Sequence, residues 1–384
     1  MIQIGAIQIL RAVAALMVVF SHAQNDTWVA ALKNGTHFTR LTLVPWDSGV
    51  DLFFVISGFI MVYSSQNLFA TPGASSAFIS RRLIRIVPLY WLITAIALIF
   101  SAYAAWLGKH AFPDISEILA SFGFFPFARP EDGQPRPLAA QGWTLNYEMF
   151  FYILFALAVR FRSPVAVAAT SLVLVSAVVA GALAKPSATA LAYWSDPIVL
   201  EFLLGMSIAL LWQRGFRLSG RYTLLFLLGG IGLLTLDIDQ MTRVSALGVD
   251  NNGFGRLFGA GFPMAAIFAA VVLGASSTST GGRAAAFVAL IGDASYALYL
   301  FHPLAIIFLR KCCLALGLAN LIGFWPLVAG EILVALGLSV AIHALIEKPV
   351  TAALRRWWQP DAGRTMQQRS PAESQEILVS NAPD

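Results

Sequence analysis

Two ionisable residues stand inside an otherwise apolar segment close to the N-terminus. Arg11 and His22 belong to the run IQILRAVAALMVVFSHAQ, residues 7–24. They are eleven residues apart, close to three turns of α-helix, so both side chains are expected on one helix face, about 16 Å apart along the axis. Ionisable groups at such depths are costly in lipid, so we expect this face to meet protein or a water-filled cavity and to be functional.

Three side chains at the far end of this segment are candidates for proton chemistry. His22 is the candidate general base, because histidine titrates near neutrality and a neutral ring accepts a proton. The alternative is a buried histidine that only hydrogen-bonds to a neighbour. Asp26 could orient the ring or be a solvated loop acid. Asp51, which begins the run DLFFVISGF, is expected at the depth of His22 and is either its catalytic partner or an interfacial acid.

A basic cluster precedes another apolar segment. Residues 81–85 read RRLIR and lead into VPLYW. Arg82 and Arg85 are three residues apart, so their guanidinium groups should point the same way, which suits the binding of phosphate or pyrophosphate. The alternative is that these arginines only set the orientation in the membrane.

Further polar residues interrupt later apolar segments. Glu148 lies about a turn and a half inside the run WTLNYEMFFY. Each such residue could be a structural contact between helices. Their number favours a polar path through the bundle, with the arginines at its inner end. The residues expected to share the outer half are His22, Asp51, Glu148, Glu201 and His302. Along the run GDASYALYLFHPL, Asp293 is expected nearer the inner face, with Tyr296, Tyr299 and His302 progressively further out.

The elements that must position these residues are membrane helices. Of the 384 residues, 58% are hydrophobic and only 12% are charged, so the chain cannot hide its apolar surface in a soluble core. We predict an all-α polytopic bundle of about ten transmembrane helices. Their approximate bounds are 6–23, 49–65, 86–108, 143–160, 164–184, 196–213, 221–236, 258–276, 287–309 and 321–346, and residues 122–127 are expected at an interface.

Basic residues predict the orientation of this bundle. With both termini cytoplasmic, the loops on the inner side carry arginines and no acids, as the positive-inside rule requires. Arg310 and Lys311 do not fit this rule, because they would lie on the outer side of the membrane. The inner arginines are Arg81, Arg82, Arg85, Arg160, Arg162, Arg214, Arg217, Arg221 and Arg283.

The ends of the chain and its composition limit other interpretations. Residues 1–350 are expected to form one membrane domain. Residues 351–384 are expected to form a cytoplasmic, largely disordered tail, which begins with a basic anchor ending in Trp357 and Trp358. The net charge of +5 comes from loop arginines, and nothing supports nucleic-acid binding. The adjacent Cys312 and Cys313 give no metal-ligand pattern and no ordinary disulfide. Arg11 interrupts the first segment, which argues against a cleaved signal peptide.

Six motifs together are similar to the acyltransferase-3 family of integral membrane acyltransferases, most closely to the exopolysaccharide O-acetyltransferases. They are Arg11-x10-His22, GVDLFFVISGF, RRLIRIVPLYW, WTLNYEMFFY, YALYLFHP and the closing Glu347-Lys348-Pro349. The resemblance covers about residues 5–350, and the motifs follow the family's order. It implies ten membrane helices in the bacterial inner membrane and acyl transfer from cytoplasmic acyl-CoA to a hydroxyl of an exported glycan.

The resemblance also implies roles for individual residues. His22 matches the family's essential histidine, and Arg11 matches its motif partner. Arg82 and Arg85 match a pair that is proposed to engage the donor. Glu148 matches the acid of the WxLxxE stretch, although Met149 stands where many relatives have a second acid, which disfavours a carboxylate pair.

The expected enzyme uses acyl-CoA, most simply acetyl-CoA, as a donor substrate and has no tightly bound cofactor or metal. Its acceptor is a polysaccharide or a lipid-linked oligosaccharide. Either His22 deprotonates a sugar hydroxyl that attacks the thioester directly, or an enzyme nucleophile relays the acyl group. The main alternative is a transporter or flippase for a lipid-linked glycan, since intramembrane charges also mark substrate pathways. A sensory membrane protein without catalysis is a further alternative.

Overall fold

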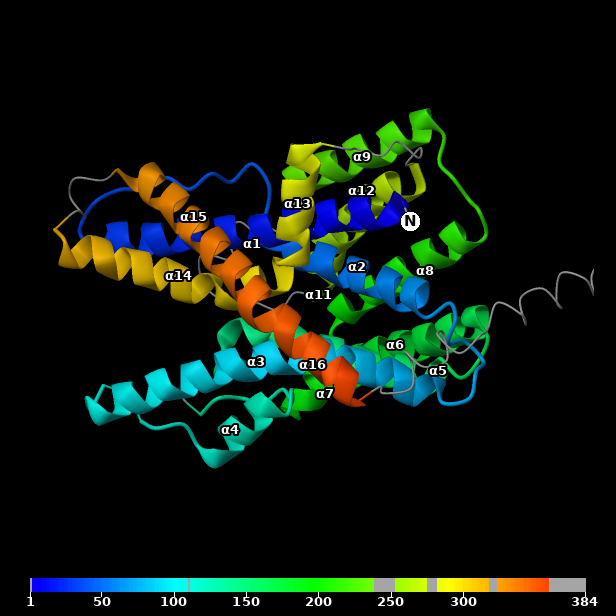
Figure 1. The fold of residues 1–384 in the computed structure, drawn as a ribbon, viewed down its shortest axis with the longest axis horizontal. Coiled ribbons are helices and arrows are strands. Elements are labelled where there is room, and N and C mark those ends of the chain that lie inside the picture. Colours follow the sequence, from blue (N-terminus) through cyan, green and yellow to red (C-terminus); the bar gives the residue numbers. More distant parts are fainter. Residues whose placement is uncertain are drawn as a thin grey trace, which may run out of the picture.

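The computed structural model describes residues 2–109, 111–130, 132–237, 253–274, 282–317 and 323–358. Every regular element in these ranges is helical (Figure 1), which confirms the predicted all-α bundle. Seven of the described helical stretches are long and apolar enough to cross a membrane. They are Gly5–Lys33, Trp46–Ser64, Ala74–Trp106, Ser163–Ala184, Gly253–Gly274, Ser295–Ala315 and Phe324–Trp358.

Most connections between the described helices are short, but 12 residues separate α1 from η1 and 17 separate α4 from η2. In chain order they are α1 (Ile2–Lys33), η1 (Trp46–Ser48), α2 (Gly49–Ser64), α3 (Ala74–Trp106), α4 (Ile115–Phe122), η2 (Ala140–Gly142), α5 (Trp143–Ala158), α6 (Ser163–Ala184), α7 (Thr189–Trp194), η3 (Pro197–Val199), α8 (Leu200–Gln213), α9 (Gly220–Thr235), α11 (Gly253–Arg256), η4 (Leu257–Gly261), α12 (Phe262–Gly274), α13 (Arg283–Asp293), α14 (Ser295–Ala315), α15 (Phe324–Ile342), η6 (His343–Glu347) and α16 (Lys348–Trp358). Both η4 and η6 are π-helical turns.

Some predicted segments differ from the observed helices. The expected span at 287–309 is two helices, α13 and α14, which meet at a sharp angle (Figure 1). Here α13 crosses α1 so closely that a Cβ atom on Gly292 would lie 2.2 Å from the carbonyl oxygen of Gln8. Helix α5 has 16 residues, and Pro197–Gln213 and Gly220–Thr235 are shorter apolar helices. The number of ten spans therefore stays a prediction.

Close contact between α2 and α8 forms the centre of the bundle. A Cβ atom on Gly58 would lie 2.1 Å from the carbonyl oxygen of Phe202, and one on Gly205 would lie 2.0 Å from that of Val55. Only glycine allows the two backbones to approach in this way, as is common for small residues between membrane helices. The small residues in the middle of α2 therefore serve a close helix contact.

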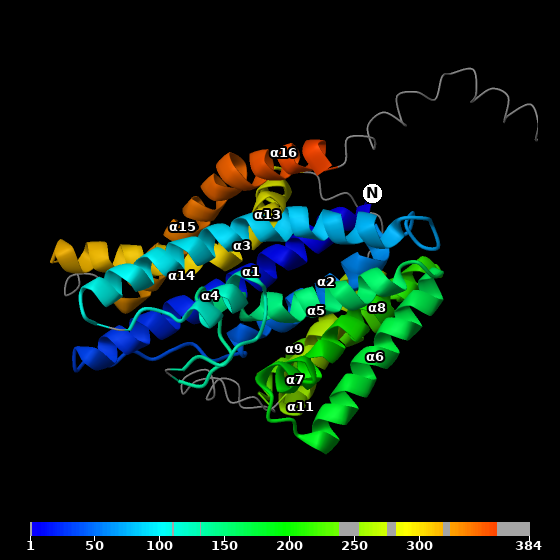
Figure 2. The same cartoon turned by 90° about the horizontal axis from the view of Figure 1, so that it is seen from below.

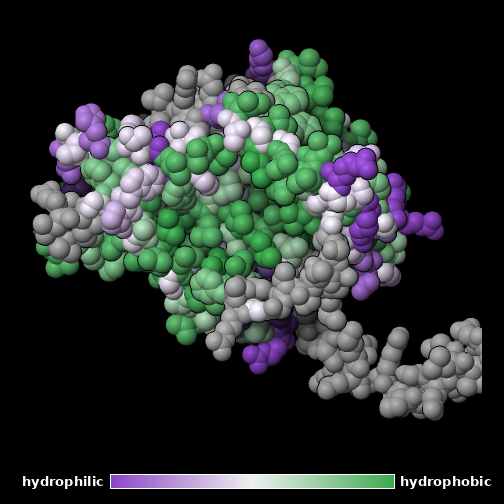
Figure 3. Space-filling view, turned by 90° about the horizontal axis from the view of Figure 1, so that it is seen from above, coloured by the Kyte–Doolittle hydropathy of each residue, from purple (hydrophilic) through white to green (hydrophobic). Residues whose placement is uncertain are grey.

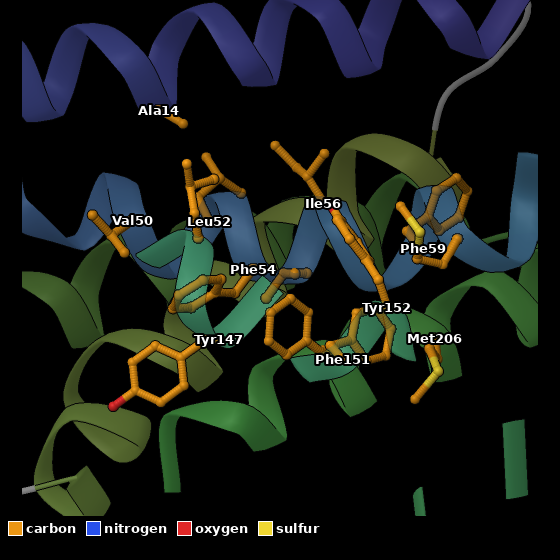
Figure 4. Close-up of a cluster of buried hydrophobic side chains, with 14 of the residues drawn as sticks. Ala14, Val50, Leu52, Phe54, Ile56, Phe59, Tyr147, Phe151, Tyr152 and Met206 are labelled. Carbon is orange, nitrogen blue, oxygen red and sulfur yellow. The ribbon is translucent and has the colours of Figure 1, made fainter. Parts of the chain in front are cut away.

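Aromatic side chains fill the space between α2, α5 and α8. The rings of Phe151 and Phe202 stack with centroids 4.3 Å apart, and Phe54 packs against Phe202 at 4.9 Å. Figure 4 shows Phe54, Phe151 and Tyr152 between these helices, with Ala14 of α1 above them. Rigid packing of this kind fixes the spacing of the helices that carry the polar residues.

The outer surface is arranged as expected for a membrane protein. In Figure 2, α6, α8 and α9 lie on one side of α1 and α2, and α15 and α16 lie on the other. A hydrophobic belt covers the middle of the face in Figure 3, and hydrophilic residues gather toward both ends of the long axis. Helix α16 continues to Trp358, so residues 351–358 are helical. The predicted tail from Gln359 onward lies outside the described residues.

Candidate active site

The face of α1 that carries Arg11 and His22 is turned toward α2 and α14. Both residues lie on one uninterrupted helix, so the predicted placement on a common face follows from its periodicity. Arg11 is buried and donates from Nη1 to Oε1 of Gln8 at 3.1 Å. Gln8 in turn donates to Asp293. His22 is exposed, so this face is enclosed at Arg11 and open at His22.

A cavity of about 90 Å³ lies beside this face and contains the predicted basic residues. Its walls come from α1, α2, α3, α5 and α14. Three guanidinium groups and one carboxylate line it, so the cavity carries excess positive charge. The polar lining residues are Arg11, Ser57, Arg82, Arg85, Thr144, Glu148, Tyr152, Ser295, Tyr296 and Tyr299.

The two arginines of α3 differ in their contacts. Arg82 donates from Nη2 to Oγ of Ser64 at 2.5 Å, and its guanidinium lies 5.4 Å from the ring centroid of Phe78. Arg85 lines the cavity without a hydrogen bond or ion pair to the described residues. It is therefore the arginine most available to an anionic ligand.

Glu148 had been expected to lie with His22, but the structure places it among these arginines. Its carboxylate accepts hydrogen bonds from Oγ of Ser57 at 3.0 Å and from Oη of Tyr152 at 2.6 Å, and its charge acts on Arg82. The predicted outer group of acids and histidines was wrong in this respect.

At the other end of this face, His22 lies beside a second histidine, His302. The ring of His302 lies 4.9 Å from that of His22, at an interplanar angle of 61°. Nδ1 of His22 is 2.9 Å from the Val18 carbonyl oxygen, and Nδ1 of His302 is 3.1 Å from that of Leu298. Because a carbonyl only accepts, both Nδ1 atoms carry the proton, and both Nε2 atoms are left as bases.

Tyr299 connects the cavity to this histidine pair. It lines the cavity, and its ring centroid is 6.2 Å from that of His302. Its hydroxyl donates to the carbonyl oxygen of Gln141 at 2.9 Å and lies 3.0 Å from Oγ1 of Thr144. Tyr299 therefore lies between the arginine-lined cavity and the two histidines, and a continuous polar path through the bundle stays a prediction.

Asp51 has a different partner from the one predicted. Both of its oxygens accept from Arg256, from Nε and Nη2 at 2.9 Å each, and its side chain is fully buried. Arg256 also lies 5.6 Å from the ring centroid of Trp143. Glu201 is buried nearby and interacts with Asp51 and Arg256. The proposed partnership of Asp51 with His22 is therefore not what the structure brings together.

Sequence reasoning missed Arg256, and a signal for it existed. It is a single arginine in the run GFGRLFGAGF, directly before the π-helical turn η4. A lone charge inside an apolar segment should have a buried partner of opposite sign. Asp51 meets that requirement.

Asp26 likewise does not orient His22. Its Oδ1 accepts from Nη1 of Arg310 at 2.7 Å, and Nδ1 of His22 is already bonded to its own helix. This ion pair also accounts for the basic residue on α14 that conflicted with the positive-inside pattern. Asp26 and Arg310 partly neutralise each other where α1 and α14 lie side by side.

No group of three or more histidine, cysteine, aspartate or glutamate side chains in the described ranges could hold a metal ion. Cys312 and Cys313 are free thiols.

Comparisons with known proteins agree with the motifs. A family model described as an acyltransferase domain matches residues 4–344. The exopolysaccharide production protein ExoZ of Rhizobium meliloti (strain 1021) is 33% identical over 335 residues, which covers 84% of this chain and 93% of that protein. No solved structure matches the chain.

Proposed function

Because the chain belongs to the acyltransferase-3 family of multi-pass membrane O-acyltransferases, we propose that it transfers an acetyl group from cytoplasmic acetyl-CoA to a sugar hydroxyl of an exported polysaccharide. The observation that carries this proposal is the cavity that holds Arg11, Arg82 and Arg85, whose lining residue Tyr299 lies beside His302 of the histidine pair. Exopolysaccharide as the acceptor is carried over from the ExoZ relative.

The donor binds at the arginine end of the cavity. An acyl-CoA carries several phosphate charges, and guanidinium forks bind phosphate oxygens in pairs. Its long flexible arm separates the phosphates from the thioester. The arm can therefore follow the cavity while the phosphates stay near Arg82 and Arg85. Glu148 holds a negative charge among the arginines and, with Ser57 and Tyr152, keeps this wall of the cavity hydrogen-bonded.

The acceptor meets His22, which is the exposed residue of the pair. Nε2 of His22 takes the proton of a sugar hydroxyl while the oxygen attacks the thioester carbonyl carbon. The carbon–sulfur bond breaks, and the proton passes from His22 to the thiolate of CoA. Asp51 stays outside the chemistry in this scheme and, through Arg256, holds α2 against α11.

This arrangement requires both chain ends on the cytoplasmic side of the bacterial inner membrane. The exposed arginines near the α2–α3, α5–α6 and α8–α9 connections support this orientation. In the same orientation, residues 1–350 form the membrane domain and the chain after them is cytoplasmic. Helix α16 then lies at the inner surface as an amphipathic helix.

The test is thiol release from acetyl-CoA by purified protein given the polysaccharide. We expect His22→Ala to abolish release and His37→Ala, a change at an exposed histidine outside the cavity, to leave it intact. An active His22→Ala protein would contradict the proposal. A transporter would consume no acetyl-CoA in any variant. Labelled acetyl-CoA without polysaccharide separates the two routes, because direct transfer leaves no label on the protein.

A further inference from the structure

The buried His302 is left without a role by the mechanism above. It is 1% exposed, whereas its neighbour His22 is exposed. Its Nε2 is buried, and no donor in the described part of the chain reaches it. Buried acceptors are nearly always hydrogen-bonded, because losing water without gaining a partner is costly. An orphaned base beside the proposed catalytic histidine therefore needs an explanation.

The backbone of α14 sets the proton of this ring. Pro303 follows His302 and has no N–H, so the carbonyl of Tyr299 loses its helical donor. The His302 ring interacts with that carbonyl and with the carbonyl of Leu298. The Leu298 carbonyl, which only accepts, keeps the proton on Nδ1. The lone pair is thereby fixed on Nε2, which is the negative end of the ring's dipole.

We propose that His302 is a positioning residue that stabilises the positive charge formed on His22 during acyl transfer. This inference rests on the proposed function, in which His22 is the base. When His22 takes the hydroxyl proton, it becomes a cation 4.9 Å from a neutral ring that has an unshared electron pair. The attraction exists only while His22 is charged, so it lowers the barrier and leaves the ground state almost unchanged.

The proton balance of the reaction is unaffected by His302. The proton moves from the sugar hydroxyl to Nε2 of His22 and then to the CoA sulfur, and His302 keeps its own Nδ1 proton throughout. Its edge-to-face contact also limits the rotation of the exposed His22 ring, which faces open space on its other side. His302 therefore acts through His22 and does not touch the substrate.

The test compares three substitutions in full-length protein purified in the same detergent. In His302→Gln the amide can place an oxygen where Nε2 lies. In His302→Asn the shorter side chain reaches only the position of Nδ1, and His302→Leu removes both polar atoms. We expect kcat to fall about 10- to 100-fold in the Asn and Leu variants, as for the loss of one charge-assisted contact, and less than about 5-fold in the Gln variant. The KM for acetyl-CoA and the melting temperature of the Gln and Asn variants should match each other.

Each possible result decides the matter. A kcat in His302→Asn equal to that of His302→Gln would overturn the inference, because loss of the Nε2 acceptor would then be without effect. Combining His302→Asn with His22→Gln should cause little further loss, whereas independent roles would multiply the two losses. If His22→Ala is fully active, the proposed function itself fails. If His22→Ala is inactive while His302→Asn keeps its kcat, only this inference fails.

Discussion

At the scale of single residues, Arg85 is expected to contribute most to donor binding. It lines the cavity and has no competing hydrogen bond among the described residues, whereas Arg82 is held by Ser64. We predict that Arg85→Ala raises the KM for acetyl-CoA about 10- to 100-fold, the usual cost of a charge-assisted contact. Initial rates of thiol release against donor concentration measure this change.

Two further variants control that prediction. Arg81→Ala removes a neighbouring exposed arginine that does not line the cavity, so its KM should stay within about 2-fold of the original value, because surface charges contribute little. Arg85→Lys keeps the charge but not the planar fork, so it should recover only part of the lost affinity. An equal effect of Arg81→Ala and Arg85→Ala would mean that general surface charge attracts the donor.

In this scheme the ion pair between Asp51 and Arg256 stabilises the folded protein and takes no part in catalysis. Asp51→Asn leaves a guanidinium without its counter-ion in a largely buried site, where side-chain exposure is 20% for Arg256 and 0% for Asp51. We predict a loss of about 3 kcal/mol or more in the free energy of unfolding, because breaking a buried pair costs more than replacing it. Denaturant unfolding in detergent measures it.

The matched control for this prediction replaces both partners. Asp51→Leu combined with Arg256→Met should be more stable than Asp51→Asn, since no charge is left unpaired. If Asp51→Asn is as stable as the original protein but inactive, Asp51 takes part in the chemistry after all.

The residue types and spacing predicted which side chains line the path but not all of their partners. Helix periodicity places Arg82 and Arg85 on one face, but it did not show that they meet Arg11 and Glu148 in one cavity. Asp51 was assigned by depth along the membrane normal and Asp26 by its spacing from His22, and their true partners are 205 and 284 residues away in sequence. Depth does not determine which helices are neighbours, so pairing across the bundle needs the fold.

At the scale of helices, the contact with α8 fixes the position of α2, which forms one wall of the cavity. Gly205→Ala would place a methyl group 2.0 Å from the carbonyl oxygen of Val55, so the helices must move apart. We predict a loss of about 1–3 kcal/mol in unfolding free energy, as for overpacking, together with lower activity. Gly229→Ala in α9 is the control, since nothing lies within 4 Å of its added atom and alanine favours the helix.

Hydropathy predicted most helices but not where they bend. The segment at 287–309 divides because α13 turns to cross α1, at the short run Gly292-Asp293-Ala294-Ser295 that the prediction left inside one span. The π-helical turn η4 begins directly after Arg256, and the π-helical turn η6 begins at His343. Such turns were not predicted because they change helical register without changing composition.

If Gly205→Ala proves as stable as Gly229→Ala, the backbone contact between α2 and α8 is not as tight as the structure indicates.

At the scale of the whole molecule, the two ends of the bundle have different chemistry. In the proposed reaction the arginine cavity binds a polyanionic donor, and the exposed His22 meets an acceptor from the other side. Such a division works only if the membrane separates the two substrates. The orientation of the chain is therefore part of the mechanism.

Cysteine labelling in intact cells tests this orientation. In a background with Cys312→Ser and Cys313→Ser, which removes both native thiols, single cysteines are placed at exposed sites near opposite ends of the bundle. Asn34→Cys follows α1, and Thr71→Cys lies between α2 and α3. A membrane-impermeant maleimide should label Asn34→Cys from outside and Thr71→Cys only after permeabilisation. The reverse pattern would place the arginine cavity away from cytoplasmic acetyl-CoA, and the proposed donor could then not reach it.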